Sequence, residues 1–203
     1  MLADLVNNPI ILLAWLLALV IAITIHEFAH AYAADRLGDP TPQLQGRLSL
    51  NPLKHLDPIG TLMLLFFRFG WGKPVEFDSY NLRHPRRDAA VISLAGPAVN
   101  LVLATILSLV LKFSPSSLFS IFLYPVILIN INLAIFNLLP VPPLDGAKIL
   151  YGILPRAWAD EYNDFMGRYG TILLILLIIP IGGSSLAINL ILPVINWITN
   201  LLL

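Results

Sequence analysis

An uncharged apolar run from Ile10 to Ile25 leads directly into the sequence HEFAH, residues His26 to His30. A run of this length and composition is typical of a membrane-spanning helix, which needs about 20 mostly apolar residues. Ionisable side chains at membrane depth are costly and by default indicate a functional site. The placement of HEFAH therefore predicts chemistry at or within a lipid bilayer.

The composition supports a membrane protein along the whole chain. Of the 203 residues, 58% are apolar and only 12% are charged, whereas soluble domains carry about 25% charged residues. The net charge is zero, so nothing predicts nucleic-acid binding. Cysteine is absent, and any bound metal must therefore use histidine and carboxylate ligands.

Four stretches are long and apolar enough to cross a bilayer, at about Pro9–Ala34, Ala89–Leu111, Leu118–Leu139 and Tyr169–Leu203. The last is interrupted by residues 180–185 and forms either one broken helix or two short ones. A shorter apolar piece, 59–69, precedes turn-rich residues, which favours a re-entrant β-hairpin or loop near 59–80. We expect an all-α polytopic membrane protein with about five to six membrane helices, folded as a single domain over residues 1–203.

The distribution of Lys and Arg predicts the orientation. Eight of the twelve basic residues lie between Arg36 and Arg87, and three more follow the third apolar stretch. Basic loops remain on the cytoplasmic side. The HEFAH end of the first helix and the end of the third stretch, residues 137–140, are therefore both expected at the cytoplasmic face of a multi-pass cell-membrane protein.

The spacing of HEFAH is that of an H-E-x-x-H motif. On a helix, His26 and His30 share one face and together can hold one Zn²⁺. Glu27 lies beside that pair, where its carboxylate can take a proton from zinc-bound water. The alternative is that the two histidines only meet headgroups or water at a helix end.

A catalytic zinc site usually has three protein ligands and an open position for water. Asp145 is the best third candidate, because it follows the proline-rich residues 140–143 and precedes Gly146, which together favour a sharp bend back toward the bilayer. Asp145 would equally serve as the N-cap of a helix at about 147–154. The predicted topology favours the ligand role, since it places Asp145 on the same membrane face as the two histidines.

Several motifs in this order resemble the site-2 protease family of intramembrane zinc metalloproteases, in its compact subgroup without PDZ or CBS domains. They are HEFAH, the segments 33–40 and 46–60, PRRD at 85–88, SLAGPAVN at 93–100 and LPVPPLDG at 139–146. The resemblance covers roughly residues 10–154, whereas the hydrophobic segment 168–203 is not diagnostic. It implies a membrane endopeptidase with one Zn²⁺ per chain and transmembrane proteins as substrates.

The resemblance also implies residue roles. His26, His30 and Asp145 would bind the zinc ion. Glu27 would act as general base and then as proton donor to the leaving amine. Asn137 stands where the family has an asparagine that would donate to the substrate carbonyl or oxyanion, although the longer spacing to Asp145 in this chain leaves that role open.

Three features near these residues are also candidates for function. Gly96 and Asn100 lie one helical turn apart and predict either close helix packing with a hydrogen bond across the core, or a part in catalysis. His55 is expected to hydrogen-bond with Asp57 in a proline-bounded turn, with substrate contact, ligand orientation or blocking of the site as alternatives. Residues 70–77 can offer a strand edge to an extended substrate.

Together these features favour an intramembrane zinc metalloendopeptidase that cleaves peptide bonds in or near transmembrane segments of membrane proteins. A membrane metal-binding or transport protein would need the histidines but not Glu27. An inactive scaffold relative would not need the complete set of ligands and base. A peptidase with a glutamate ligand would have to use Glu76 or Glu161, neither of which lies on an evident apolar helix.

Overall fold

The computed structural model describes residues 8–57, 59–60, 72–113, 117–181 and 183–203. Its helices are α2 (Pro9–Leu37), α3 (Thr41–Leu44), α5 (Pro85–Phe113), α6 (Ser117–Asn137), α7 (Asp145–Ile153), α8 (Arg156–Ile178) and α9 (Leu186–Leu202), with two 3-10 turns, η1 (Pro52–Lys54) and η2 (Ser79–Asn81). Within these ranges the strands are β1 (Pro180–Ile181) and β2 (Ser184–Ser185), which pair antiparallel. The predicted all-α membrane fold is confirmed.

Three described helices are long and apolar enough to cross a membrane, namely α2, α5 and the part of α6 from Phe119 to Asn137. The fourth predicted stretch is divided between the end of α8 and the shorter apolar helix α9, which are joined by the β1–β2 turn. The expected re-entrant hairpin falls largely on residues 61–71, outside the described residues. On either side of that segment, Leu56 and Gly72 form one antiparallel bridge.

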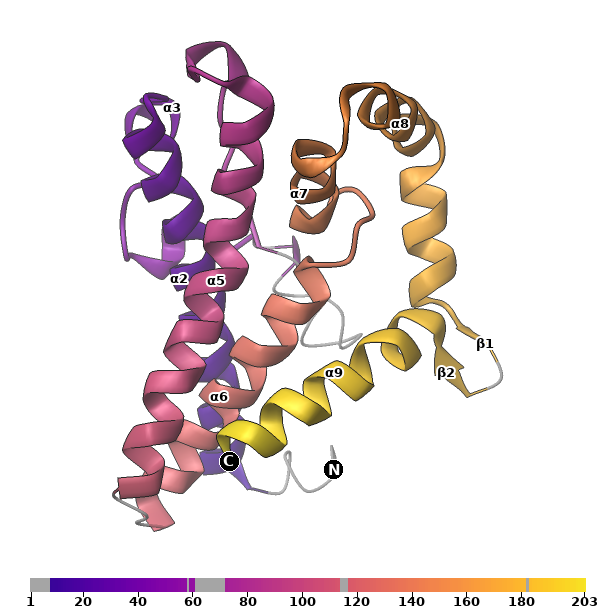
Figure 1. Cartoon of the computed structure of the whole chain (residues 1–203). Helices are drawn as coiled ribbons and strands as arrows, with labels where there is room; N and C mark the ends of the chain where they lie inside the picture. Colours follow the sequence, from indigo (N-terminus) through magenta and orange to yellow (C-terminus); the bar gives the residue numbers. More distant parts are fainter. Residues whose placement is uncertain (1–7, 58, 61–71, 114–116, 182) are drawn as a thin grey trace.

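Helices α2, α5 and α6 form a bundle in which α2 and α6 run in one direction and α5 runs in the other (Figure 1). The stripe Ala14, Ala18 and Ala22 on α2 is buried, and residues this small let membrane helices approach closely. Helix α9 packs across α6, with Ile195 in a core cluster beside Ile127. Because α2 and α6 run in the same direction, α6 ends beside the C-terminal half of α2, which carries the HEFAH residues.

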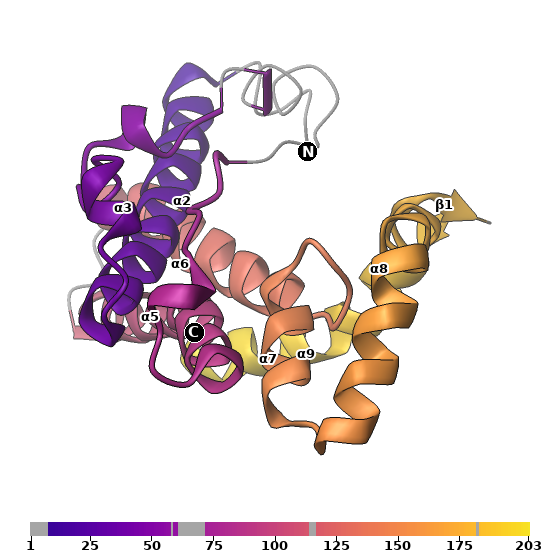
Figure 2. The same cartoon turned by 90° about the horizontal axis from the view of Figure 1, so that it is seen from above.

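The short helix α7 and the longer α8 lie to one side of this bundle (Figure 2). Helix α7 packs closely on α5, because a Cβ on Gly152 would collide with Ala90. Helix α8 contacts the chain just before α7, since Gly170 lies against the ring of Pro142. The start of α7 thus lies beside the C-terminal end of α6, with α5 and α8 on either side.

Helix α2 continues without a break through HEFAH and ends at Gly38, whose φ of 107° is the left-handed conformation that glycine tolerates best. The next residue, Asp39, is fully buried. Its carboxylate accepts hydrogen bonds from the Thr41 backbone and hydroxyl, the Asp78 backbone and the Asn81 amide. Asp39 therefore ties the segment that follows residues 72–77 to the end of α2.

Burial works to raise the pKa of Asp39, but the hydrogen bonds from Thr41, Asn81 and Asp78 outweigh it and hold that pKa below its ordinary value of 3.8. We expect Asp39→Ala to lower the free energy of unfolding by about 3 kcal/mol, since it removes the buried, charged acceptor of four hydrogen bonds. The loss is measured by unfolding in detergent at pH 7. Asp160→Ala, at an exposed position on α8, should change stability by less than about 0.5 kcal/mol.

The stability difference between the wild type and Asp39→Ala should also depend on pH. A carboxylate with a depressed folded-state pKa stabilises the fold fully above its ordinary pKa, and that contribution is lost as the pH falls through the folded-state value. The stability difference between the wild type and Asp39→Ala should therefore narrow below pH 3.8. A difference that is constant from pH 7 to pH 3 would contradict a hydrogen-bonded, ionised Asp39.

Candidate metal centre

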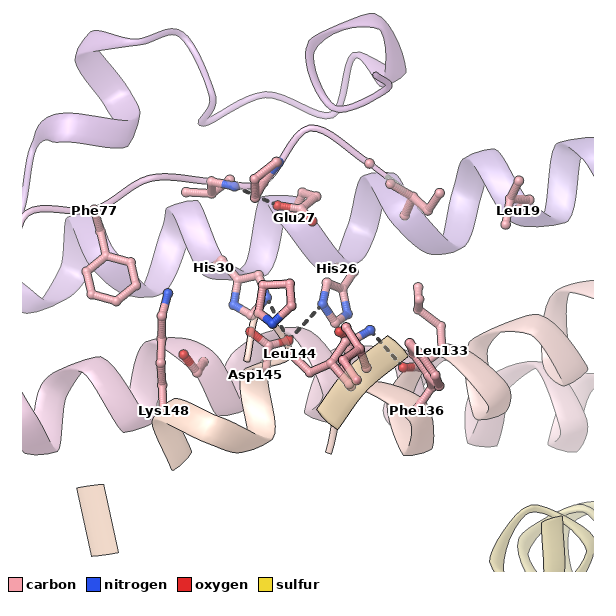
Figure 3. Close-up of a pocket in the computed structure, with 18 of the residues that line it drawn as sticks. Leu19, His26, Glu27, His30, Phe77, Leu133, Phe136, Leu144, Asp145 and Lys148 are labelled. Atoms are coloured by element: carbon pink, nitrogen blue, oxygen red, sulfur yellow. Dashed lines mark hydrogen bonds and ion pairs between the residues drawn. The ribbon is translucent and has the colours of Figure 1, made fainter. Parts of the chain in front are cut away.

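Three potential ligands from two distant parts of the sequence converge beside the C-terminal end of α6 (Figure 3). His26 and His30 project from successive turns of α2, and Asp145 is the first residue of α7. The Asp145 Oδ2 atom lies 3.1 Å from His26 Nε2 and 3.2 Å from His30 Nε2. All three ligand atoms lie within 4.8 Å of one another. Two imidazole nitrogens and one carboxylate oxygen fit Zn²⁺ and leave a fourth position open.

Asp145 does not act as the N-cap that the sequence alone allowed. The N-cap of α7 is Leu144, and no side chain caps this helix. Burial works to raise the pKa of Asp145, but hydrogen bonds with His26 and His30 hold it well below the usual range of a carboxyl group. The carboxylate is therefore ionised and directed at the two histidines.

Gly146 explains how the chain turns back to place Asp145. A Cβ at this position would collide with the backbone carbonyls of Leu138 and Leu139, which directly follow α6. The glycine is thus required for a close approach between the start of α7 and the end of α6, which brings the carboxylate to the end of the bundle.

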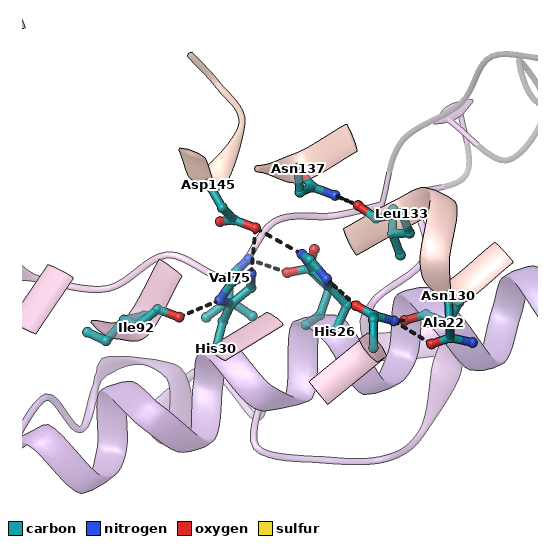
Figure 4. A network of polar contacts seen from close by, with 11 residues as sticks. Ala22, His26, His30, Val75, Ile92, Asn130, Leu133, Asn137 and Asp145 are labelled. Carbon is teal, nitrogen blue, oxygen red and sulfur yellow. Dashed lines mark hydrogen bonds and ion pairs between the residues drawn. The ribbon is translucent and has the colours of Figure 1, made fainter. Parts of the chain in front are cut away.

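Helix α5 contacts the outer nitrogen of each imidazole ring, which is Nδ1, the nitrogen that does not face Asp145 (Figure 4). His26 Nδ1 lies 2.6 Å from Asn100 Oδ1, and His30 Nδ1 lies 2.8 Å from the carbonyl oxygen of Ile92. Gly96 lies between these two contacts. A Cβ on Gly96 would be 2.5 Å from His30 Nε2 and 2.7 Å from His26 Cε1. The close packing expected of the Gly96–Asn100 face is therefore packing against the histidine rings themselves.

Glu27 faces a different element, the extended residues 72–77. Its Oε2 atom accepts a hydrogen bond of 2.9 Å from the backbone N–H of Val75 (Figure 3). This segment is anchored in turn, because the Lys73 N–H donates to the His55 carbonyl and the buried Arg47 guanidinium donates to the carbonyls of Lys54 and Lys73. The Glu27 carboxylate is thus fixed beside the three ligands without bonding to them.

A cavity of about 400 Å³ contains this group. Its walls are largely apolar and come from α2, α6, α8 and residues 72–77, with Leu19, Ile23, Leu133, Phe136, Leu174 and Ile178 among them. Lys148 also lines the cavity, with its ammonium 4.6 Å from the centroid of the Phe77 ring. A concave, mostly apolar site with a few convergent polar groups is typical of a substrate pocket.

Two other residues singled out in the sequence have clear positions. Asn137 lines the cavity, and its Nδ2 donates to the Leu133 carbonyl one turn earlier on α6 (Figure 4). His55 is fully buried. Its Nε2 lies 2.6 Å from the Ser49 carbonyl, and its Nδ1 has no hydrogen-bond partner among the described residues. Asp57, its expected partner, accepts a bond from the Gly60 N–H.

Comparison with known proteins identifies related zinc metalloproteases. Residues 112–177 match Peptidase family M50. The chain is 36% identical over 193 residues to the Bacillus subtilis protein "Putative zinc metalloprotease YwhC", covering 88% of this chain and 86% of the relative. It is 30% identical over 182 residues to "Putative zinc metalloprotease Rip2" of Mycolicibacterium smegmatis, covering 84% of this chain and 66% of that relative. No solved structure gave a significant match.

The chain is thus similar to a zinc metalloprotease over most of that relative's length. It also has helices long and apolar enough to cross a membrane, and a cluster of two histidines and one aspartate that could hold a metal. This chain belongs to peptidase family M50, the site-2 protease family, and is a multi-pass membrane zinc metalloprotease.

Proposed function

We propose that residues 1–203 form a single intramembrane endopeptidase domain that cleaves peptide bonds in or near transmembrane segments of other membrane proteins. One observation carries this proposal. The ligand cluster His26, His30 and Asp145 and the adjacent Glu27 line one apolar cavity between helices that are long enough to cross a bilayer. A substrate that reaches this cavity must bring apolar side chains to match its walls.

We propose His26, His30 and Asp145 as the ligands and Glu27 as the general base. Zinc held there would polarise the scissile carbonyl and lower the pKa of a water in its open position. Glu27 takes a proton from the attacking water, whose oxygen bonds to the carbonyl carbon. As the C–N bond breaks, Glu27 returns that proton to the leaving nitrogen. The Val75 N–H donates to one Glu27 oxygen, which supports a fixed orientation of the carboxylate for proton transfer.

Asn137 is proposed as a donor to the substrate carbonyl oxygen. Its side chain lines the cavity and uses one amide hydrogen on the Leu133 carbonyl. An asparagine amide carries two hydrogens, and the second is available for a carbonyl that develops negative charge. Residues 72–77 are proposed to lie along the substrate, since their extended backbone borders the cavity next to Glu27.

The orientation proposed for the site is toward the cytoplasmic side of the cell membrane. The end of the bundle that carries the site also carries the start of α5, with Arg86 and Arg87, and the start of α8, with Arg156. Lys112, in contrast, lies near the opposite end of α5. This asymmetry supports the proposed orientation because basic segments stay on the cytoplasmic side.

The proposal is tested by reconstituting the protein in liposomes with a single-span substrate. We expect cleavage by the wild type, none by Glu27→Gln, and a cut that mass spectrometry places in or near the span. A second substrate is a water-soluble peptide with the residues around the cut site but without the rest of the span. Faster cleavage of this peptide would contradict an intramembrane endopeptidase, as would cuts that fall only in the soluble flanks of the single-span substrate.

Substitution of Asp145 tests the ligand set. We expect Asp145→Ala to weaken zinc binding by more than the roughly 10- to 100-fold that follows loss of an outer-shell partner, because it removes one of three ligands. Zinc is measured by competition with a chelator on purified protein, with Asp160→Ala as the control. Full zinc retention in Asp145→Ala would place the third ligand elsewhere and return Glu76 and Glu161 to consideration.

A further inference from the structure

We propose that Asn100, held by Asn130, is a positioning residue that fixes His26 in the tautomer with its proton on Nδ1, so that the lone pair on Nε2 faces the metal. The proposal rests on the metal site of the proposed function and assigns a role to two asparagines that touch neither substrate nor metal.

The contacts form a continuous chain across three helices (Figure 4). Asn130 on α6 donates from Nδ2 to the Val126 carbonyl at 2.8 Å. Asn100 on α5 donates from Nδ2 to Asn130 Oδ1 at 2.6 Å and to the Ala22 carbonyl on α2 at 3.1 Å. Its Oδ1 lies 2.6 Å from His26 Nδ1. Both asparagines are completely buried, so water does not compete for these bonds.

The direction of every bond in this chain follows from its two ends. The carbonyls of Val126 and Ala22 can only accept, so each must face an amide NH₂ group. Asn130 must therefore turn its Oδ1 toward Asn100, and Asn100 must turn its NH₂ toward Asn130. This leaves Asn100 Oδ1 facing His26. Since this oxygen is an acceptor, the His26 nitrogen opposite it must carry the proton.

The consequence for the site is that the inner face of the cluster is made of acceptors. The Ile92 carbonyl imposes the same tautomer on His30. In the neutral rings the two Nε2 lone pairs then face the Asp145 oxygen at 3.1 and 3.2 Å. These contacts are hydrogen bonds only when a ring carries a proton on Nε2, so each lone pair otherwise needs a cation between it and the carboxylate. The contacts of Asn100 with His26 and of the Ile92 carbonyl with His30 thus orient both rings for metal binding before a metal is present.

The two histidines differ in one respect that makes the proposal testable. The outer nitrogen of His30 is held by a backbone carbonyl, which no substitution removes. The outer nitrogen of His26 depends on a side chain, Asn100, whose own orientation depends on Asn130. Loss of either asparagine should therefore affect His26 and leave the His30 ring in its tautomer.

The first measurement is zinc affinity of the full chain in detergent, by competition with a chelator. We expect Asn100→Ala to bind zinc roughly 10- to 100-fold more weakly than the wild type. Asn130→Ala should lose less, because the Ala22 carbonyl still orients Asn100. The matched control is Asn132→Ala, since Asn132 makes the same type of bond to the Leu128 carbonyl on α6 but is exposed. Its zinc affinity should not change.

The second measurement is ¹⁵N NMR of histidine-labelled, zinc-free protein, which reports the tautomer and not the stability. We expect His26 to carry its proton on Nδ1 in the wild type and in Asn132→Ala. In Asn100→Ala the His26 proton should shift toward Nε2, where the Asp145 carboxylate accepts it, while His30 does not change. Asn130→Ala should show a smaller shift in the same direction, because Asn100 is still held by the Ala22 carbonyl.

Two results would overturn the proposal. One is a folded Asn100→Ala variant that binds zinc as tightly as Asn132→Ala. The other is a wild-type His26 that carries its proton on Nε2. If the wild type binds no zinc at all, the proposed function fails, but the NMR measurement still decides whether the asparagines fix the tautomer. The two failures are therefore distinguishable.

Discussion

Replacement of Glu27 by glutamine is expected to reduce the rate of substrate cleavage by about 10³-fold, within the range that a general base contributes, while zinc binding stays at one ion per chain. Glutamine keeps the shape of the side chain, and its amide oxygen still accepts from the Val75 N–H. It cannot take a proton from water. The rate is measured on a reconstituted single-span substrate, and zinc is measured on the same preparation.

Glu161→Gln is the matched control for this substitution. Glu161 on α8 carries the same charge, but its side chain is exposed and does not line the cavity. We expect its cleavage rate to stay within about twofold of the wild type. Equal rates for the wild type and Glu27→Gln would show that Glu27 is not the base. Loss of zinc in Glu27→Gln would show that it supports the metal instead.

Gly96→Ala is expected to have the second large effect, on both zinc affinity and activity. Its new Cβ would lie 2.5 Å from His30 Nε2 and 2.7 Å from His26 Cε1. Both rings must therefore shift, or α5 must move away from α2, and each change displaces the ligands. Because a misplacement of about 1 Å can cost on the order of 100-fold in rate, we expect at least that loss of cleavage, together with weaker zinc binding.

Gly167→Ala controls for the addition of one methyl group to a helical glycine. A Cβ at Gly167 would meet nothing within 4 Å, and alanine favours a helix more than glycine does. We expect this variant to keep full activity and to be slightly more stable. A fully active, zinc-loaded Gly96→Ala would mean that the two rings do not pack against this residue. Unfolding curves for both variants separate a displaced site from a lost fold.

The sequence predicts the part of the site that is local on one helix. His26 and His30 are four residues apart, so a helix is sufficient to place them on one face. Asp145 is far along the chain, and only the predicted topology places it at the same membrane face. Its local sequence fits an N-cap equally well. The structure excludes the N-cap role, since no side chain caps α7, and Gly146 packs against the end of α6 so that the carboxylate lies beside the two histidines.

Other parts of the site have little or no sequence signal. The contacts from Val75 to Glu27 and from Ile92 to His30 use backbone atoms. Every residue type supplies a carbonyl, and every type other than proline supplies an N–H. Asn130 does carry a signal, since a buried amide inside an apolar helix indicates a specific partner. The sequence does not identify that partner, because the register between α5 and α6 is set by packing along both helices.

The continuous course of α2 through its two histidines has a consequence for the reaction products. At about 1.5 Å per residue, His30 lies about 10 Å before the end of the helix at Leu37. Under the proposed intramembrane cleavage, with the end of α2 at the membrane surface, a cut at that depth would divide a substrate span of about 20 residues into pieces of about 13 and about 7 residues. A span needs about 20 apolar residues to stay in a bilayer, so the shorter piece has too little apolar surface to remain anchored. Its departure into water makes religation improbable and gives the cut a direction.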